Sequence, residues 1–191
     1  MSLRDAVVWH PTMLPPSGLP ERFLDATPSG IGNAAIRAVV DRYLAAFWRE
    51  ASAGIAPAFF GKPGEWKTYG AAVIVRYALS QRLPVAFVEC GPWFLRADAL
   101  FYAVEGPRML DDLARAPFVV LDDVTQVQPS TRAAELMANV LAVRFGAQRP
   151  TLVTGNAPMR AAEDLRRFGE LYRADFARRL RHGSTGYWAA V

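Results

Sequence analysis

Short, largely apolar segments alternate with helix-length segments along most of this sequence. The apolar runs read Ala-Phe-Phe, Val-Ala-Phe-Val, Phe-Val-Val-Leu and Thr-Leu-Val, and they begin at residues 58, 85, 118 and 151. Strands that are apolar on both faces are typical of a parallel sheet that helices cover on each side. With a further strand near the C-terminus, the alternation predicts a three-layer α/β fold with a five-stranded parallel sheet between helices.

The expected elements follow from apolar periodicity and from residues that break it. A helix capped by Asn33 should run to about residue 53, where Gly54 ends it. Residues 91–116 should form two helical pieces that break near Gly106-Pro107, and the helical segment 159–181 should break at Gly169. The remaining expectations are strands at 56–60, 84–89, 118–121, 151–154 and 186–190, and helices from the end of the 61–68 turn to about residue 82 and from 130 to 145.

The length of 191 residues fits one domain, and no repeat or linker divides the chain. We expect an N-terminal arm at residues 1–17 and a single core at residues 18–191. No apolar run approaches the roughly 20 residues of a membrane-spanning helix. One cysteine excludes an internal disulfide, and two histidines leave little for a His-based metal centre. A reducing, cytoplasmic setting without membrane contact is therefore expected.

The distribution of basic residues is uneven. The formal net charge of +4 is too small to indicate nucleic-acid binding. Residues 160–191 hold seven arginines and four acids, which fit either a solvated helix face or contacts to a DNA backbone. Only Lys62 and Lys67 among the 22 basic residues are lysines. A lysine in such an arginine-rich chain indicates a place that needs a compact ammonium.

The segment 61–68, Gly-Lys-Pro-Gly-Glu-Trp-Lys-Thr, joins the first strand to a helix. This context is typical of a P-loop, whose backbone N–H groups and helix N-terminus bind phosphate. Lys67 would contact the β- and γ-phosphates, and Thr68 would bind Mg²⁺. Trp66 departs from the pattern G-x-x-x-x-G-K-[ST], which has glycine there, and its indole either crowds the phosphates or points away. A plain strand-to-helix turn and a small-molecule kinase are alternatives, although residues 91–130 lack the arginine cluster of a kinase lid.

Polar residues follow the third and fourth predicted strands. Asp122 and Asp123 end one run, and Thr154-Gly155-Asn156 ends the next. The carboxyl ends of parallel strands meet at a ligand-binding crevice, so these groups are expected beside the phosphate site. Asp122 would hold Mg²⁺ through water, Asp123 would orient and deprotonate an attacking water, and Asn156 would contact the γ-phosphate or that water. A helix-capping Asp pair and a turn Asn are the alternatives.

Together these motifs resemble the AAA+ ATPase domain of the bacterial DnaC/IstB-like helicase-loader family. The segment 18–27 looks like the family's G-[IL]-P-x-R-[FY]-x-[DN]-[AS]-[TS] entry motif, and 121–124 looks like its Walker B motif. The segment 143–145 is similar to the [NS]-x-R-[YF] helix end, and 149–156 is similar to the sensor-1 strand. The segment 176–183 resembles the terminal [IL]-x-[SD]-R-[LIM]-x-x-G motif.

The resemblance implies a P-loop NTPase of the AAA+ type that binds ATP and Mg²⁺. It places the entry motif near the adenine. It also makes Arg179 an arginine finger that completes a neighbouring subunit's site, with Arg178 as the alternative, beside the catalytic Asp123 and Asn156. The implied nucleotide contacts are Phe23, Gly61, Lys62, Pro63, Gly64, Glu65, Trp66, Lys67, Thr68 and Tyr69, and the implied metal contacts are Thr68 and Asp122.

The function that the resemblance implies is control of a replicative helicase. The ATP state would set the interaction with the helicase and with single-stranded DNA during DNA replication, and subunits would associate through their ATP sites. Because Trp66 replaces the Walker A glycine, a non-hydrolysing ATP-binding switch or scaffold is an alternative, and an IstB-like transposition helper is another. Family members generally carry an N-terminal partner-binding domain, and about 17 residues precede the entry motif here. Two expectations follow: either such a domain has been removed, or the chain is a short, phage-encoded member.

Overall fold

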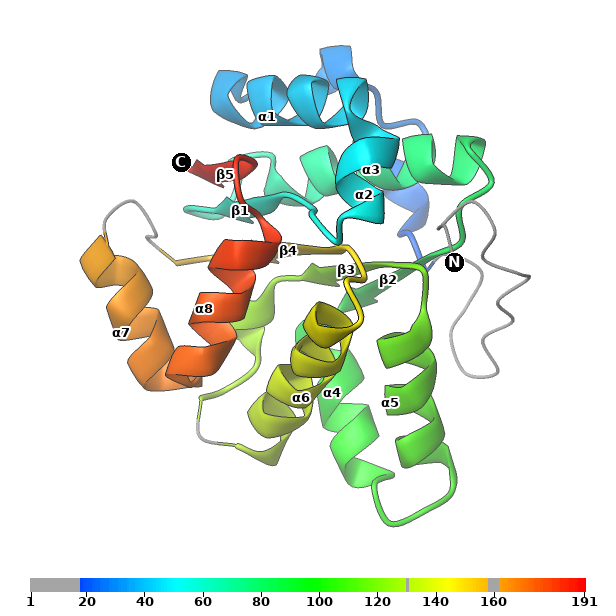
Figure 1. The fold of residues 1–191 in the computed structure, drawn as a ribbon, viewed down its shortest axis with the longest axis vertical. Coiled ribbons are helices and arrows are strands. Elements are labelled where there is room, and N and C mark those ends of the chain that lie inside the picture. The colour runs from blue at the N-terminus through cyan, green and yellow to red at the C-terminus, as the bar shows by residue number, and fades with distance from the viewer. Residues whose placement is uncertain (1–17, 130, 158–161) are drawn as a thin grey trace.

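A parallel β-sheet crosses the molecule between two layers of helices (Figure 1). The computed structural model describes residues 18–129, 131–157 and 162–191, so the expected arm at 1–17 lies outside the described residues. The strands lie in the order β2-β3-β4-β1-β5, and every neighbouring pair is parallel. The predicted α/β fold with a five-stranded parallel sheet is confirmed. The strands are β1 (Ala58–Phe60), β2 (Val85–Glu89), β3 (Phe118–Asp122), β4 (Thr151–Gly155) and β5 (Trp188–Ala190).

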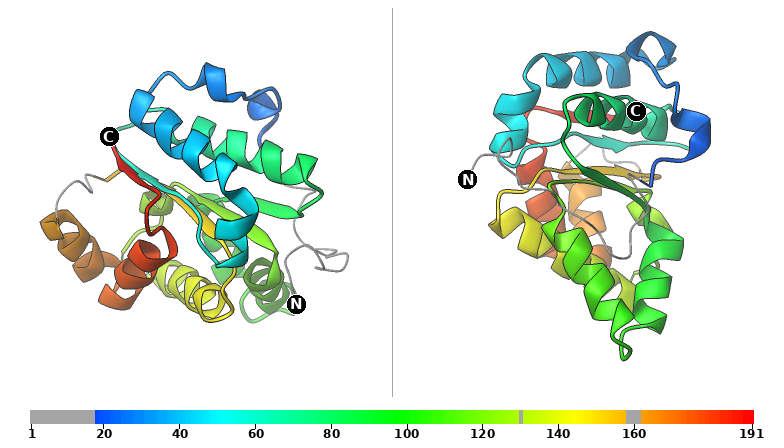
Figure 2. Two further views of the ribbon diagram at one scale, coloured as in Figure 1. Left: turned by 45° about the horizontal axis from the view of Figure 1, so that its top comes forward. Right: turned by 90° about the vertical axis from the view of Figure 1, so that its right-hand side faces the viewer.

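Helices cover both faces of this sheet. The helices α1, α2 and α3 lie over one face, and α4, α5, α6 and α8 lie over the other, with α7 packed beside α8 (Figures 1 and 2). None of the described helices is both long enough and apolar enough to cross a membrane. The helices are α1 (Ala34–Ala45), α2 (Phe47–Ser52), α3 (Lys67–Ser80), α4 (Cys90–Ala99), α5 (Glu105–Arg115), α6 (Arg132–Gly146), α7 (Ala162–Tyr172) and α8 (Ala174–Gly183), with short 3₁₀ turns at Glu21–Phe23, Pro28–Gly30 and Val124–Gln126.

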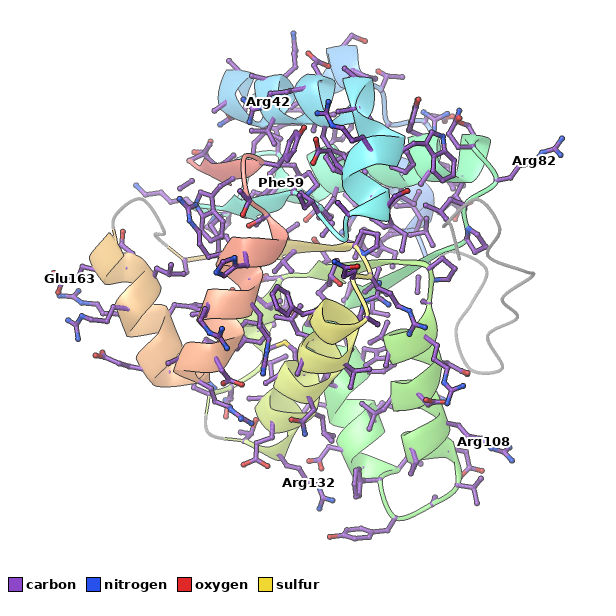
Figure 3. All side chains as sticks on the ribbon, viewed as in Figure 1. Arg42, Phe59, Arg82, Arg108, Arg132 and Glu163 are labelled. Atoms are coloured by element: carbon purple, nitrogen blue, oxygen red, sulfur yellow. The ribbon has the colours of Figure 1, made fainter. Side chains whose placement is uncertain are left out.

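Alternating side chains along each strand divide the apolar interior into two clusters. Phe59 of β1 packs with residues of α1 and α3, whereas Ala58 and Phe60 pack with the helices on the opposite face. Figure 3 shows Phe59 inside the molecule, while the charged side chains of Arg82 and Arg108 project from its periphery. Because both faces of the sheet are buried, the strands read as continuous apolar runs rather than as alternating ones.

The first helical segment is capped as predicted. The Oδ1 atom of Asn33 accepts hydrogen bonds from the backbone N–H groups of Ala35 and Ile36, which satisfies donors of the first turn. The segment is interrupted at Ala46, so α1 and α2 replace the single helix that was expected. Gly54 follows α2 at φ 78°, as predicted for a glycine that terminates a helix.

Both segments form two helices as predicted, but the breaks lie at 100–104 and at Arg173, a few residues from the glycines expected to cause them. The pair Gly106-Pro107 lies in the first turn of α5, where the missing N–H of proline has no helical partner to lose. The break between α7 and α8 falls at Arg173, which adopts φ 80°. Gly169 stays helical, and a Cβ atom there would lie 3.3 Å from the Cα atom of Ala174. That glycine therefore permits the close approach of two helices and does not end one.

The guanidinium of Arg144 on α6 is fully buried and binds only oxygen atoms. Burial lowers the pKa of Arg144, while five acceptors compensate for the loss of hydration of its charge. These acceptors come from the end of α5 and the amino ends of β3 and β4, at the edge of the sheet opposite to the predicted site. They are the Thr151 hydroxyl and the carbonyls of Leu113, Ala114, Ala116 and Pro150.

Candidate functional site

A cavity of about 500 Å³ opens at the carboxyl ends of the strands, beside the turn that precedes α3. Most residues that the sequence predicted for the site line this cavity. They are Phe23, all residues from 63 to 69, and Asp122, Asp123 and Asn156. Among the described residues, the predicted Gly61, Lys62 and Arg179 do not line it. The turn before α3 and the ends of β3 and β4 therefore lie around one cavity.

The backbone of the turn is open toward the cavity. Gly64 adopts φ 85°, and no atom lies within 4 Å of a Cβ atom placed on it. Gly61 lies at the base of the turn, where a Cβ atom would come 2.2 Å from the carbonyl oxygen of Val191. The helix α3 begins at Lys67, and the first N–H groups of a helix have no acceptor within it. This end of α3 can therefore bind an anion such as phosphate.

Trp66 keeps the backbone conformation of the glycine that it replaces. It lies just before α3 at φ 66° and ψ 16°, in the left-handed region that favours glycine. Its indole turns toward Gly32, since a Cβ atom on that glycine would lie 2.5 Å from the ring. The ring also packs edge-on against Tyr69, with the centroids 5.3 Å apart. The indole thus packs on a neighbouring segment, while Trp66 also lines the cavity and is 43% exposed.

We expect the Trp66→Gly variant to be more stable than Trp66→Ala. Both variants lose the indole contact with Gly32, but only alanine keeps the strain of a positive φ. The difference in the free energy of unfolding should be about 1 kcal/mol. Urea denaturation of the two variants measures it. Equal stabilities would show that residue 66 leaves the left-handed region once the indole is gone.

Two further contacts fix the turn to the segment 27–33. The Nδ2 atom of Asn33 donates to Oε2 of Glu65 at 2.9 Å. The backbone N–H of Thr27 donates to the Tyr69 hydroxyl at 3.3 Å. Because Asn33 also caps α1, the turn is connected to the start of that helix. The term 27–33 clamp is used below for the contacts of Glu65, Trp66 and Tyr69 with the segment 27–33.

The side chain of Lys67 is buried beneath the turn. Only 6% of the residue is exposed, and Nζ donates to the carbonyl oxygen of Lys62 at 2.5 Å. Burial lowers the pKa of Lys67, and the nearby carboxylates of Asp123, Glu65 and Asp122 oppose that shift. A phosphate oxygen can replace the carbonyl as the acceptor. Lys62 thus contacts Lys67 through its backbone carbonyl, while its own side chain is exposed.

Asp122 connects the end of β3 to α3 and to β4. Its Oδ1 atom accepts hydrogen bonds from the hydroxyls of Thr68, at 2.9 Å, and Thr154, at 2.7 Å. The residue is buried, and burial raises the pKa of its carboxyl group although both hydroxyl donors lower it. A carboxylate with a neighbouring hydroxyl is a donor set that suits Mg²⁺, which completes its coordination with water and phosphate oxygens. Thr68 and Asp122 thus fit a magnesium ion that would neutralise phosphate charge.

The isosteric Asp122→Asn substitution should stabilise the ligand-free protein slightly at neutral pH. Because the folded-state pKa of Asp122 lies above the unfolded one, its ionisation costs stability above the folded-state pKa. The advantage of the variant should shrink as the pH falls through that pKa and vanish below the unfolded value of about 3.9. Urea unfolding at neutral and at acid pH measures both effects. A variant less stable than the wild type at neutral pH would contradict this expectation.

Asp123 and Asn156 are in direct contact at the centre of the site. Oδ2 of Asp123 accepts from Nδ2 of Asn156 at 2.6 Å and from Nε2 of Gln126 at 3.0 Å. Oδ1 accepts from the Thr125 hydroxyl at 2.5 Å. The backbone N–H of Asp123 donates to the Thr154 hydroxyl at 2.8 Å, so Thr154 bridges the two aspartates. The carboxylate of Asp123 is therefore held in one orientation by three side-chain donors.

Three lining residues were missed from the sequence: Arg22, Glu89 and Gln126. Thr154 was expected beside the site but was given no role there. Glu89 ends β2, so the rule that strand ends line such sites would have found it. The guanidinium carbon of Arg22 lies 4.9 Å from the ring centre of Phe23, which was predicted. Gln126 carries no signal of its own in the sequence, because its role depends on the 3₁₀ turn after β3.

Neither arginine-finger candidate lies at the cavity of its own chain. Arg179 of α8 donates from Nη1 to Oδ2 of Asp175 at 2.6 Å, one helical turn away. Arg178 is exposed and lines a separate hollow of about 480 Å³ between α7 and α8. Neither arginine therefore contributes to the cavity of its own chain.

The arginines considered for DNA contact are mostly ion-paired. Arg166 and Arg167 pair with acids of their own helix, and Arg173 pairs with Asp175. Arg160 lies outside the described residues. This pairing favours a solvated helix face, the first of the two interpretations of the basic segment.

No family model and no curated protein matches this sequence. Solved structures do match in fold. A crystal structure of the DnaC helicase loader has a TM-score of 0.75 at 17% identity, covering 88% of this chain and 99% of that one. A crystal structure of DnaI has a TM-score of 0.70 at 19% identity, covering 86% and 91%.

A more distant match is the replication initiator DnaA bound to AMPPCP and single-stranded DNA. Its TM-score is 0.62 at 15% identity, and the match covers 78% of this chain and 48% of that one. At such identities the likeness establishes the fold alone. The expected likeness in fold to helicase loaders is therefore confirmed, and DnaA is a further structural neighbour.

Proposed function

We propose that this chain is an ATP-binding AAA+ core whose nucleotide binds in the cavity at the start of α3. The observation that carries the proposal is the assembly of Lys67, Thr68 and Asp122 around an open, glycine-containing turn. Phosphates would bind the N–H groups of the turn and the ammonium of Lys67. Thr68 and Asp122 would hold Mg²⁺, and the base would lie toward Phe23 at the mouth of the cavity.

We also propose that the site hydrolyses ATP to ADP and phosphate. Asp123 and Asn156 form one hydrogen-bonded pair that lines the cavity. In this position they can orient a water molecule for attack on the γ-phosphate. The fixed orientation of Asp123 supports such a role, because a positioned acceptor lowers the ordering cost of the reaction.

The proposed partner is a replicative helicase, with single-stranded DNA as a further ligand that depends on ATP state. This part of the proposal comes from the fold neighbours, one of which is a helicase loader and another of which contains single-stranded DNA. A transposition helper with the same ATP chemistry differs only in its partner. Co-purification with a helicase or with a transposase distinguishes them.

For the arginine finger we propose Arg179, acting on the site of a neighbouring subunit. Its ion pair with Asp175 holds the side chain at the surface of α8, and that pair would have to exchange for a phosphate contact. Arg178 remains the alternative, because it is exposed on the same helix. Comparing turnover by Arg178→Ala and Arg179→Ala decides between the two.

A second candidate function is an ATP-dependent switch without turnover. The hydrogen bonds of Asp123 favour it, since three side-chain donors already bind that carboxylate. Nucleotide binding would then change the affinity for the partner, and no phosphate would be released.

Titration of a fluorescent ATP analogue into the wild-type protein tests the proposed binding. We expect one saturable site per chain and binding that weakens when Mg²⁺ is removed by a chelator. Phosphate release under the same conditions separates the ATPase from the switch. Failure to bind the analogue with Mg²⁺ present would refute both versions.

A further inference from the structure

Among the described residues, four carboxylates line the cavity, and Glu89 is the one to which neither the 27–33 clamp nor the proposal above gives a role. Glu89 is the last residue of β2 and lines the cavity. Its side chain is exposed, and within the described part of the chain it has no hydrogen-bond or ion-pair partner. An unneutralised carboxylate beside a phosphate site repels an anionic ligand. A carboxylate that is retained at this position despite the repulsion indicates a chemical role.

Strand register places Glu89 beside Asp122. Their Cα atoms are partners in the parallel β2–β3 ladder, and paired residues of a parallel ladder project to the same face of the sheet. Two positions earlier, Phe87 and Val120 both pack in the cluster on the face that α1 and α3 cover. Both carboxylates therefore project on the α3 side, where Lys67 begins the helix.

The carboxylates of Asp123 and Glu89, which both lie next to Asp122, differ in the number of hydrogen bonds that they accept from the protein. Asp123 already accepts three side-chain hydrogen bonds, and a carboxylate offers about four acceptor positions. Glu89 has its acceptor positions free of protein donors, and its side chain is one methylene longer. A group that takes a proton from water must approach that water to hydrogen-bond distance. The geometry thus suits Asp123 for orienting the water and Glu89 for receiving its proton.

We propose that Glu89 is the catalytic residue that accepts the proton of the attacking water. The proposal rests on the ATPase function proposed above, and it divides the role first expected of Asp123 alone. The water oxygen bonds to the γ-phosphorus while one of its protons passes to the Glu89 carboxylate. The bond from the γ-phosphorus to the bridging oxygen breaks, and its electron pair leaves on ADP. Glu89 then returns the proton to the phosphate product, which restores the carboxylate.

The test compares Glu89→Gln with Asp123→Asn in two assays. Binding of the fluorescent ATP analogue is measured over a range of Mg²⁺ concentrations, and phosphate release is measured at saturating ATP. The matched control is Glu105→Gln, which removes an exposed carboxylate from the first residue of α5, outside the cavity. Thermal unfolding of every variant confirms that it is folded.

We expect Glu89→Gln to bind the analogue at least as tightly as the wild type, because a negative charge near the phosphates is removed. Its kcat should fall by about 100-fold or more, whereas Asp123→Asn should lose less than about tenfold and the control should not change. The half-saturating Mg²⁺ concentration should stay the same in Glu89→Gln.

Several results would overturn the proposal. A loss of kcat below tenfold in Glu89→Gln, or an equal or larger loss in Asp123→Asn, would assign the role of proton acceptor to Asp123 instead. A tenfold higher Mg²⁺ requirement in Glu89→Gln would make Glu89 a metal ligand instead. If the wild type binds the analogue but releases no phosphate from ATP, the protein does not hydrolyse ATP and Glu89 has no such role. Failure of the ATP-binding function is seen separately, as absence of analogue binding by the wild type before any turnover is measured.

Discussion

Loss of the Lys67 ammonium should weaken the binding of a fluorescent Mg·ATP analogue by about 100-fold or more. Each hydrogen bond between a charged donor and a phosphate oxygen contributes about 1.5–3 kcal/mol, and about 2.7 kcal/mol corresponds to 100-fold in affinity. Lys67 is the buried lysine that lines the cavity, with Nζ held at the turn by the Lys62 carbonyl. Titration of wild type and Lys67→Ala at fixed Mg²⁺ measures the change.

The matched control for that experiment is Lys62→Ala. Lys62 lies five residues earlier in the same turn, but its side chain is exposed and does not line the cavity. Lys62→Ala removes the same charge and should weaken binding only a few-fold. Lys67→Ala should also fold normally, because burial lowers the pKa of this ammonium and its removal relieves that desolvation. Equal losses in the two variants would mean that net charge, and not a phosphate contact, governs binding.

Replacing Arg144 with methionine should destabilise the protein by about 3–5 kcal/mol. Methionine keeps much of the volume but leaves five oxygen acceptors without their donor in the interior, and removing one member of a buried charged network has this magnitude. Arg144→Lys should recover only part of the loss, since an ammonium has three donors and no planar fork. Urea or thermal unfolding of the three proteins measures the series.

Arg149→Met is the matched control for this series. Arg149 is only half-buried, and its Nη1 donates to the carbonyl of Ala114 at 2.8 Å, so a loss near 1 kcal/mol is expected. Arg144 lies at the opposite edge of the sheet from the cavity, so the folded fraction of its variants should bind nucleotide normally. A methionine variant as stable as the Arg149 control would show that the buried carbonyls find other partners, such as water.

The parts of the fold that could be predicted are those that depend on local pattern. Strands buried on both faces must be apolar throughout, so their positions follow from the sequence within about two residues. The same rule placed Asp122, Asp123 and Asn156 at one sheet edge, because parallel strands end together. Glu89 obeys that rule as well, but it was overlooked because its strand ends in a single acid with no motif around it.

The remaining features depend on residues far apart in the sequence. The indole of Trp66 packs against Gly32, which has no side chain to displace it, and nothing near residue 66 in the sequence indicates that contact. The donor Asn156 meets Asp123 only when the turn after β3 folds against the end of β4. Gly169 was expected to break a helix because close packing of α7 on α8 is not visible in a local pattern.

The 27–33 clamp affects the entropy that a ligand would lose by ordering the turn. A glycine-containing turn left free in solution has many conformations, and a ligand that orders it loses affinity by the entropy of that ordering. Here Glu65, Trp66 and Tyr69 already fix the turn against the segment that leads into α1. Part of that ordering is therefore completed when the chain folds, and a ligand of the turn would lose less affinity to it.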